Sequence, residues 1–212
     1  MGTTELWIAT GNAKKRAELE RLLAPLGYRL RLQSELAGFT PPLEDQPDFA
    51  GNARVKARAL ALAAHGFALG DDSGLCVDAL GGRPGVHSAR YAGPHASDQD
   101  RIARLLGELS AVPRERRTAR FVCAICVCDP EGRPVLECTD ACEGVLLAEP
   151  RGGAGFGYDP LFVARDHLDR PHPPTFAELD AAEKDRISHR GRALRALRAN
   201  LQTRPLGLRS HP

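Results

Sequence analysis

Two adjacent carboxylates, Asp71 and Asp72, stand out among the residues of this chain that could carry chemistry. They follow the apolar run Phe67–Leu69 and lie between Gly70 and Gly74. The run predicts the end of a buried strand, and the glycines would let the backbone turn sharply and approach a ligand. Paired acids at such a strand end are costly unless a cation lies between them, most simply a hard divalent metal. For this short motif alone, an acidic surface turn is an equally good interpretation.

Small residues continue beyond the acids as far as Gly93, including Gly81-Gly82 and Pro84-Gly85, and Arg83 and Arg90 interrupt this run. A surface turn does not require so long a run of low bulk. The run therefore favours a segment that lies against a ligand, because glycine permits close approach of the backbone.

A strand, a tight turn and a helix are predicted at the start of the chain. Residues 5–10 read as a strand, Gly11-Asn12 breaks it, and leucines recur at helical spacing as far as Leu26, before Gly27. The free N–H groups at the start of such a helix form an anion site. The helix dipole does not favour a cation in the first turn, so Lys15 makes most sense beside a bound phosphate. A solvated lysine after an ordinary turn is the alternative.

A second lysine is predicted on a helix that runs from about Phe49 to His65 and is capped by Asp48. Asn52 and Lys56 are four residues apart, so they share one face of this helix. A solvated side chain is the default interpretation of Lys56, and a ligand role is the alternative.

A second glycine cluster extends from Arg151 to Pro160 and contains Phe156 and Tyr158. Because glycines do not crowd a flat ligand, either ring could stack on a base. The alternative is a hairpin whose aromatic side chains fill the core. Further along, a capping box that begins at Asp180 predicts a helix holding Lys184.

The rest of the chain predicts further strands and helices with no internal repeat and no dividing linker, hence one domain over residues 1–202. The expected elements are a strand over 28–33, a helix from Ser97 or Asp98 with a buried face through Leu109, a solvated loop over 114–120, strands over 121–128 and 135–139 around a turn at 129–132, an extension over 144–147, and a helix through Leu201. The tail over 203–212 has no pattern and is predicted to be frayed.

Composition argues against several classes of protein. The 212 residues include 29 lysines and arginines against 27 acids, for a net charge of +2. This balance does not indicate a dedicated nucleic-acid binder. We see no apolar run long enough to cross a membrane and no charged-then-apolar leader, so we expect a cytoplasmic protein.

The cysteines permit two interpretations. Cys123 and Cys126, with Cys138 and Cys142, have a spacing that invites a zinc site. However, the first pair falls in the sequence FVCAICVC, which is apolar on both alternating faces and typical of a buried central strand. We favour the core interpretation, and a cytosolic setting argues against disulfides.

Together these features suit a nucleoside polyphosphate site. Such a site needs N–H groups and lysines for phosphates, carboxylates for a metal and an aromatic ring for the base. The motifs match neither a P-loop nor a dinucleotide fingerprint, because GxxxxGK[ST] is missing and the glycines at 153, 155 and 157 have the wrong spacing.

The chain resembles the inosine/xanthosine triphosphate pyrophosphatase family. Four blocks carry this resemblance in order: Thr10-Gly11-Asn12-x-x-Lys15, Asp71-Asp72-Ser73-Gly74 through Ala89-Arg90-Tyr91, Phe156-Gly157-Tyr158-Asp159-Pro160, and Ser188-His189-Arg190-Gly191. A weaker fifth block combines Glu44 with Phe49-x-x-Asn52-Ala53-x-x-Lys56.

The resemblance implies an α/β fold, with a long mixed β-sheet flanked by helices and a substrate cleft between two lobes. It also implies a homodimer that hydrolyses non-canonical purine nucleoside triphosphates (ITP, dITP, XTP). The products are the nucleoside monophosphate and pyrophosphate, and the implied cofactor is Mg2+.

The resemblance also implies roles for individual residues. It matches Asp72 to the general base and Glu44, Asp72 and Asp71 to the acids of the metal site. The residues matched to phosphate binding are Thr10, Gly11, Asn12, Ala13, Lys14, Lys15, Lys56 and Ser73. Those matched to the surroundings of the base and sugar are Phe156, Gly157, Tyr158, Asp159, Lys184, His189 and Arg190. Some members have an acid before the helix asparagine, where this chain has Gly51, which leaves Glu44 as the nearest upstream metal ligand.

Three other functions are open to the residues alone. A pyrophosphatase for modified pyrimidines would use a similar site, although the Ser188-His189-Arg190 block argues against it. A nucleotide-binding regulator could keep the site without the chemistry. A metal-dependent phosphatase would release orthophosphate instead.

Overall fold

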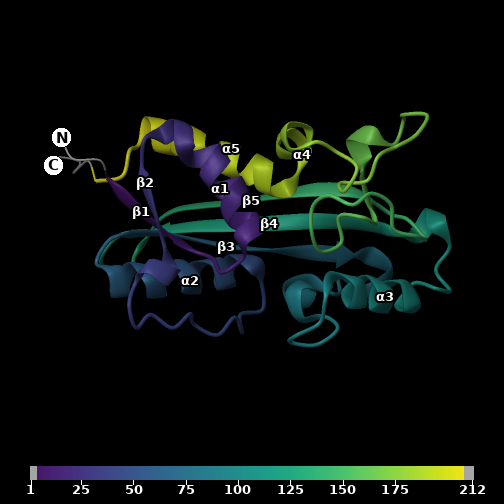
Figure 1. Cartoon of the computed structure of the whole chain (residues 1–212), viewed down its shortest axis with the longest axis horizontal. Coiled ribbons are helices and arrows are strands. Elements are labelled where there is room, and N and C mark those ends of the chain that lie inside the picture. The colour runs from purple at the N-terminus through teal and green to yellow at the C-terminus, as the bar shows by residue number, and fades with distance from the viewer. Residues whose placement is uncertain (1–3, 208–212) are drawn as a thin grey trace. The chain divides into compact units, whose positions relative to one another are not determined.

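Six strands form one mixed sheet in the order β2-β1-β3-β4-β5-β6 in the computed structural model, which describes residues 4–207 (Figure 1). β1 runs parallel to β2 and β3, whereas β5 and β6 are antiparallel. The strands are β1 Glu5–Ala9, β2 Arg29–Leu32, β3 Phe67–Val77, β4 Thr118–Cys128, β5 Pro134–Leu146 and β6 Phe162–Ala164. The helices are α1 Ala13–Leu23, α2 Phe49–Ala64, α3 Asp98–Glu108, α4 Ala181–Ile187 and α5 His189–Thr203. The predicted α/β class is confirmed.

The chain folds into two compact units. The first comprises the residues up to Asp72, Cys123–Thr139 and the residues from Ala193 onward. The second comprises Ser73–Val122 and Asp140–Arg192. The chain passes from one unit to the other inside β3, β4, β5 and α5, so neither unit is a single stretch of sequence.

In the first unit, alternate residues of β1 and β4 pack against different helices. Leu6 and Ile125 lie in a core with leucines of α1 and α5, whereas Trp7 and Cys126 lie in a core with α2. Figure 1 shows α2 on one side of these strands and α1 and α5 on the other. The prediction that FVCAICVC is a buried strand is confirmed. Cys123 belongs to the first of these cores, so it lies on the opposite face from Cys126.

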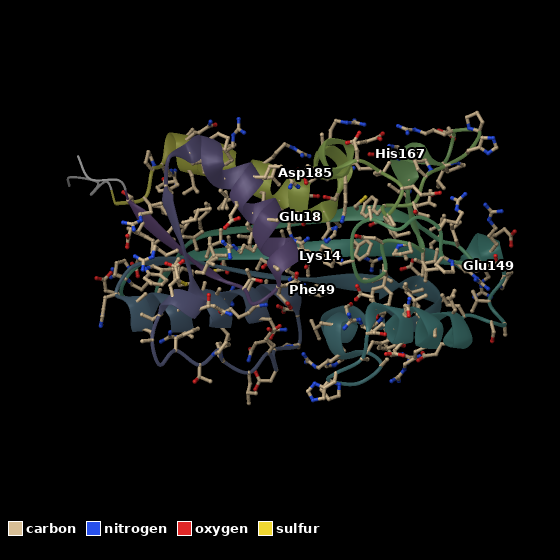
Figure 2. All side chains as sticks on the ribbon, in the orientation of Figure 1. Lys14, Glu18, Phe49, Glu149, His167 and Asp185 are labelled. Carbon is tan, nitrogen blue, oxygen red and sulfur yellow. The ribbon has the colours of Figure 1, made fainter. Side chains whose placement is uncertain are left out.

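The second unit is built around an aromatic cluster. Phe121 contacts Phe162 edge-on, with ring centroids 4.8 Å apart, and stacks on Phe176 at 5.8 Å. Ile102 of α3 and Ile187 of α4 pack into the same core. This unit also buries His167, at the end of the 3-10 turn Arg165–His167 that follows β6. Figure 2 labels this side chain.

Several predicted boundaries are wrong. The two acids do not end a strand, because β3 runs unbroken from Phe67 to Val77. The loop expected over 114–120 is a short 3-10 turn, and β4 already begins at Thr118. The strand expected to pause after residue 139 continues through Leu146.

The C-terminal part is more ordered than predicted as far as it is described. α5 extends to Thr203, and Leu206 is buried, with its N–H donating to the Tyr28 hydroxyl at 3.1 Å. The rest of the predicted frayed tail, residues 208–212, lies outside the described residues. Within residues 4–207, no helix combines the length and apolar character needed to span a membrane.

Candidate functional site

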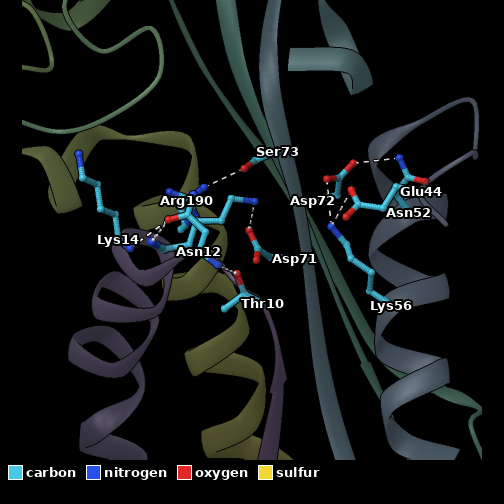
Figure 3. Close-up of polar contacts among 11 residues, drawn as sticks. Thr10, Asn12, Lys14, Glu44, Asn52, Lys56, Asp71, Asp72, Ser73 and Arg190 are labelled. Atoms are coloured by element: carbon cyan, nitrogen blue, oxygen red, sulfur yellow. Dashed lines mark hydrogen bonds and ion pairs between the residues drawn. The ribbon is translucent and has the colours of Figure 1, made fainter. Parts of the chain in front are cut away.

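Asp71 and Asp72 lie in the middle of β3, and their side chains point to opposite faces of the strand (Figure 3). Consecutive residues of a β-strand alternate in this way. The Asp71 carboxylate lies 2.9 Å from the Lys15 ammonium, and the Asp72 carboxylate lies 3.1 Å from that of Lys56. The two acids therefore do not enclose one cation, and Asp71 is placed away from the other two predicted metal ligands.

Glu44 and Asp72 do come together, around Lys56. The Lys56 ammonium lies 3.2 Å from Glu44 Oε2 as well as 3.1 Å from Asp72 Oδ1. Asn52 donates to the other Asp72 oxygen, Oδ2, at 3.1 Å. The predicted shared helix face of Asn52 and Lys56 is confirmed, because both contact Asp72 from α2 (Figure 3).

In this cluster the Asp72 carboxylate and the Lys56 ammonium are buried, whereas the Glu44 side chain is 38% exposed. Burial raises the pKa of Asp72, and the Lys56 and Lys15 ammonium groups only partly oppose this rise. Burial lowers the pKa of Lys56, but the charges of Asp71, Asp72 and Glu44 outweigh it and raise the pKa. A further cation beside Asp72 would favour its ionised form.

The donor set of this cluster fits magnesium. Mg2+ commonly takes one or two carboxylates and completes its shell with water and substrate phosphates. Glu44 and Asp72 supply two such carboxylates, and both of them contact the Lys56 ammonium. Within residues 4–207, no group of three His, Cys, Asp or Glu side chains could hold a metal. Ligands from outside the chain would have to complete the site.

The turn before α1 is held by its own side chains. Thr10 Oγ1 accepts from the Asn12 N–H at 3.2 Å, and Asn12 Oδ1 accepts from the N–H groups of Lys14 and Lys15 at 2.9 and 3.1 Å. Two N–H groups of the predicted anion site are therefore already bonded to Asn12. The turn itself is exposed at residues 11–14. Lys15 forms an ion pair with Asp71 of β3.

In the second unit, two of the predicted base and sugar residues lie beside the Phe156 ring. The Lys184 ammonium lies 4.9 Å from the Phe156 ring centroid, and the Arg190 guanidinium carbon lies 5.5 Å from it. Arg190 also donates to Ser73 Oγ at 2.7 Å. His189 stacks on Phe121 with centroids 4.8 Å apart and an interplanar angle of 11°. His189 and Arg190 are both buried.

The loop that carries Phe156 is fixed by buried contacts. Asp159 Oδ2 accepts from the Phe156 N–H at 2.8 Å and from the Lys184 ammonium at 2.7 Å. The Tyr158 ring is buried in the core, and its hydroxyl donates to the Ser88 carbonyl at 3.1 Å. Of the two predicted stacking residues, only Phe156 is partly exposed, so Tyr158 fits the core interpretation.

Sequence reasoning missed one contact that positions this loop. Asp98, the first residue of α3, accepts from the Gly157 N–H at 2.8 Å. The two residues are separated by 59 positions, and only the capping pattern around Ser97 singled out this part of the chain. No local pattern could have paired them.

Comparison with known proteins gives consistent matches over nearly the whole chain. The model of the Ham1 family matches residues 6–200. The chain is 48% identical over 191 residues to the dITP/XTP pyrophosphatase of Desulforamulus reducens, covering 90% of this chain and 92% of that protein. It is 45% identical over 194 residues to the dITP/XTP pyrophosphatase of Bacillus subtilis, covering 91% and 94%.

Solved structures give the same result. The structure of a HAM1 protein from Coxiella burnetii matches with a TM-score of 0.86 and 40% identity, covering 95% of this chain and all of that chain. The Staphylococcus aureus Ham1 protein matches with a TM-score of 0.82 and 35% identity, covering 94% and 99%.

Proposed function

This chain belongs to the Ham1 family, and we propose that it hydrolyses dITP, ITP and XTP to the nucleoside monophosphate and pyrophosphate with Mg2+. The observation that carries the proposal is the buried Asp72 carboxylate, which shares the Lys56 ammonium with Glu44. Removal of non-canonical nucleotides from the nucleotide pool would be its purpose. We also propose that the protein works as a cytoplasmic homodimer, and neither nucleic acid nor membrane is a proposed partner.

Asp72 is the proposed general base. It would accept a proton from the water that attacks the α-phosphate, and its ionised form is needed for this. Lys15 and Lys56 would offset the charge that develops on the leaving pyrophosphate. Glu44 and Asp72 would hold Mg2+, and the bound metal would supply positive charge to the phosphates. Asp71 would not hold the metal. It would instead position the Lys15 ammonium, which lies 2.9 Å from its carboxylate.

The second unit would bind the base. Phe156 is the proposed stacking platform, with Lys184 and Arg190 near its ring. Lys184 donates to Asp159 and Arg190 donates to Ser73, and an ammonium has three N–H donors while a guanidinium has five. These donors suit the 6-oxo group of hypoxanthine or xanthine, which accepts hydrogen bonds. The 6-amino group of adenine is itself a donor, so it would face the Lys184 and Arg190 donors unfavourably.

A product assay tests this proposal directly. Purified protein is incubated with Mg2+ and ITP, dITP, XTP, GTP, ATP or CTP, and pyrophosphate and orthophosphate are measured separately. We expect pyrophosphate from the inosine and xanthosine nucleotides and little from ATP or GTP. Orthophosphate would identify a phosphatase, turnover of pyrimidine nucleotides would identify the related pyrophosphatase, and binding without turnover would identify a regulator.

A further inference from the structure

Asn52 is a fully buried polar residue in the first turn of α2, at 0% exposure. Its side chain has hydrogen-bond partners on two different segments. Its amide nitrogen donates to Asp72 Oδ2 at 3.1 Å, and its amide oxygen accepts from the backbone N–H of Gln46 at 3.0 Å. A buried amide is retained at little cost only when both its ends are bonded, as they are here.

The chemistry of the two partners fixes the orientation of this amide. A backbone N–H can only donate, so the Asn52 oxygen must face Gln46. The amide nitrogen must then face Asp72, where it meets a carboxylate that accepts. The opposite orientation would set donor against donor at Gln46 and acceptor against acceptor at Asp72.

We propose that Asn52 is a positioning residue that orients the Asp72 carboxylate for the reaction. This inference rests on the function proposed above. Lys56 holds Asp72 Oδ1 while Asn52 holds Oδ2, so the plane of the carboxylate is set from both oxygens. Gln46 lies two residues after Glu44, so the same amide also ties the loop that carries Glu44 to the start of α2.

Two substitutions separate these contacts. Asn52→Ala removes both. Asn52→Asp keeps the shape and an acceptor for the Gln46 N–H, but it places an acceptor against Asp72. If Asn52 orients Asp72, both variants should lose about 100-fold in kcat for dITP, because a displacement on the order of 1 Å costs that much. KM should change by less than about 3-fold, since the phosphates are bound by other groups.

The Asn52→Asp variant distinguishes orientation of Asp72 from simple anchoring of the loop. A kcat near that of the wild type in this variant would show that only the Gln46 contact matters, and it would overturn the proposal. Asp48→Ala is the matched control, because Asp48 caps the same helix by accepting from the Gly51 N–H at 2.7 Å. We expect Asp48→Ala to lower Tm but to leave kcat unchanged. A loss of kcat equal to that of Asn52→Ala would show that a weakened α2 explains both.

A second measurement needs neither metal nor substrate. Urea unfolding midpoints are compared for the wild type, Asn52→Ala, Asp72→Ala and the double variant without metal. A direct contact predicts that the midpoint shifts of the two single variants do not add up to the shift of the double variant. Additive midpoint shifts would show that Asn52 and Asp72 do not interact and would overturn the proposal.

The outcomes also separate this inference from the proposed function. If the wild type releases no pyrophosphate, the proposed function fails while this cycle still tests the contact. If the wild type is active and both Asn52 variants keep kcat, only the present inference fails.

Discussion

Asp71 and Asp72 are neighbours in the chain, yet each contacts a different lysine on a different face of β3. Asp71 pairs with Lys15 and Asp72 with Lys56, and both carboxylates are buried. The alternation of a β-strand imposes this separation. One dipeptide thereby holds two lysines, Lys15 and Lys56, on opposite sides of the strand.

The two acids should differ in their effect on catalysis. Asp72→Asn should lower kcat by at least about 1000-fold while the protein stays folded, because an amide cannot act as the base. Asp71→Asn should raise KM for the triphosphate but leave the Mg2+ concentration for half-maximal activity unchanged. Steady-state kinetics with a Mg2+ titration measure both effects. A higher half-maximal Mg2+ concentration in Asp71→Asn than in the wild type would return Asp71 to the metal site.

Lys15 should act on the outer phosphates. Lys15→Ala is expected to weaken binding of the triphosphate by about 10-fold or more, since a charge-assisted contact of about 1.5–3 kcal/mol is lost. Binding of the monophosphate should change much less. Both nucleotides are titrated calorimetrically into inactive Asp72→Asn protein and into the Asp72→Asn, Lys15→Ala double variant, so that no nucleotide is hydrolysed during the measurement. Equal losses for the two ligands would place Lys15 away from the β and γ phosphates.

Phe156 and Tyr158 should behave differently although they are two residues apart. Phe156→Ala should raise KM for dITP by about 5-fold or more, because base stacking contributes on the order of 1–3 kcal/mol. Its metal dependence should be normal. Tyr158→Phe removes only the hydroxyl bond to Ser88 and should lower Tm without raising KM. An unchanged KM in Phe156→Ala would assign Phe156 to the core.

Gly70 should be required for packing rather than for a turn. A Cβ at Gly70 would lie 2.3 Å from the Ala53 carbonyl oxygen of α2, a backbone atom that cannot move aside cheaply. Gly70→Ala should therefore lower Tm strongly. Gly107 in α3 has no atom within 4 Å of such a Cβ, so Gly107→Ala should raise stability by about 0.5–1 kcal/mol. Thermal unfolding of both variants provides the measurement, and a tolerated Gly70→Ala would contradict this packing.

His167 should make stability depend on pH. Its side chain is only 2% exposed, neither ring nitrogen has a hydrogen-bond partner among the described residues, and burial lowers its pKa. The charged groups that act on it are Arg170, Glu183, Arg186 and Asp166. The unfolded chain takes up a proton near the ordinary histidine pKa of about 6.5, but the folded chain resists it. Stability should therefore fall as the pH drops below about 6.5.

The variant His167→Leu tests this expectation. Urea unfolding at pH 7.5 and pH 5.5 should show a smaller difference in the variant than in the wild type. His172→Asn, at an exposed position, is the control and should keep the wild-type difference. A wild-type pH dependence in His167→Leu would assign the effect to other groups.

Local patterns in the sequence predicted the order of most elements. A run that is apolar on both faces predicted β4 as a buried strand, and Asp48 and Ser97 marked the starts of α2 and α3. These signals are local, since they depend on residues within one or two turns or on a period of two. The spacing of Asn52 and Lys56 likewise placed both on one helix face.

Only the tertiary structure decided what the glycines and the two acids do. Glycine permits both a turn and close packing, and only the position of the Ala53 carbonyl shows that Gly70 serves packing. The lysine partners of Asp71 and Asp72 lie on two different helices, and no local pattern assigns either acid to either lysine. Contacts such as Asn52 with Asp72 or Asp98 with Gly157 join distant segments, and folding alone brings those segments together.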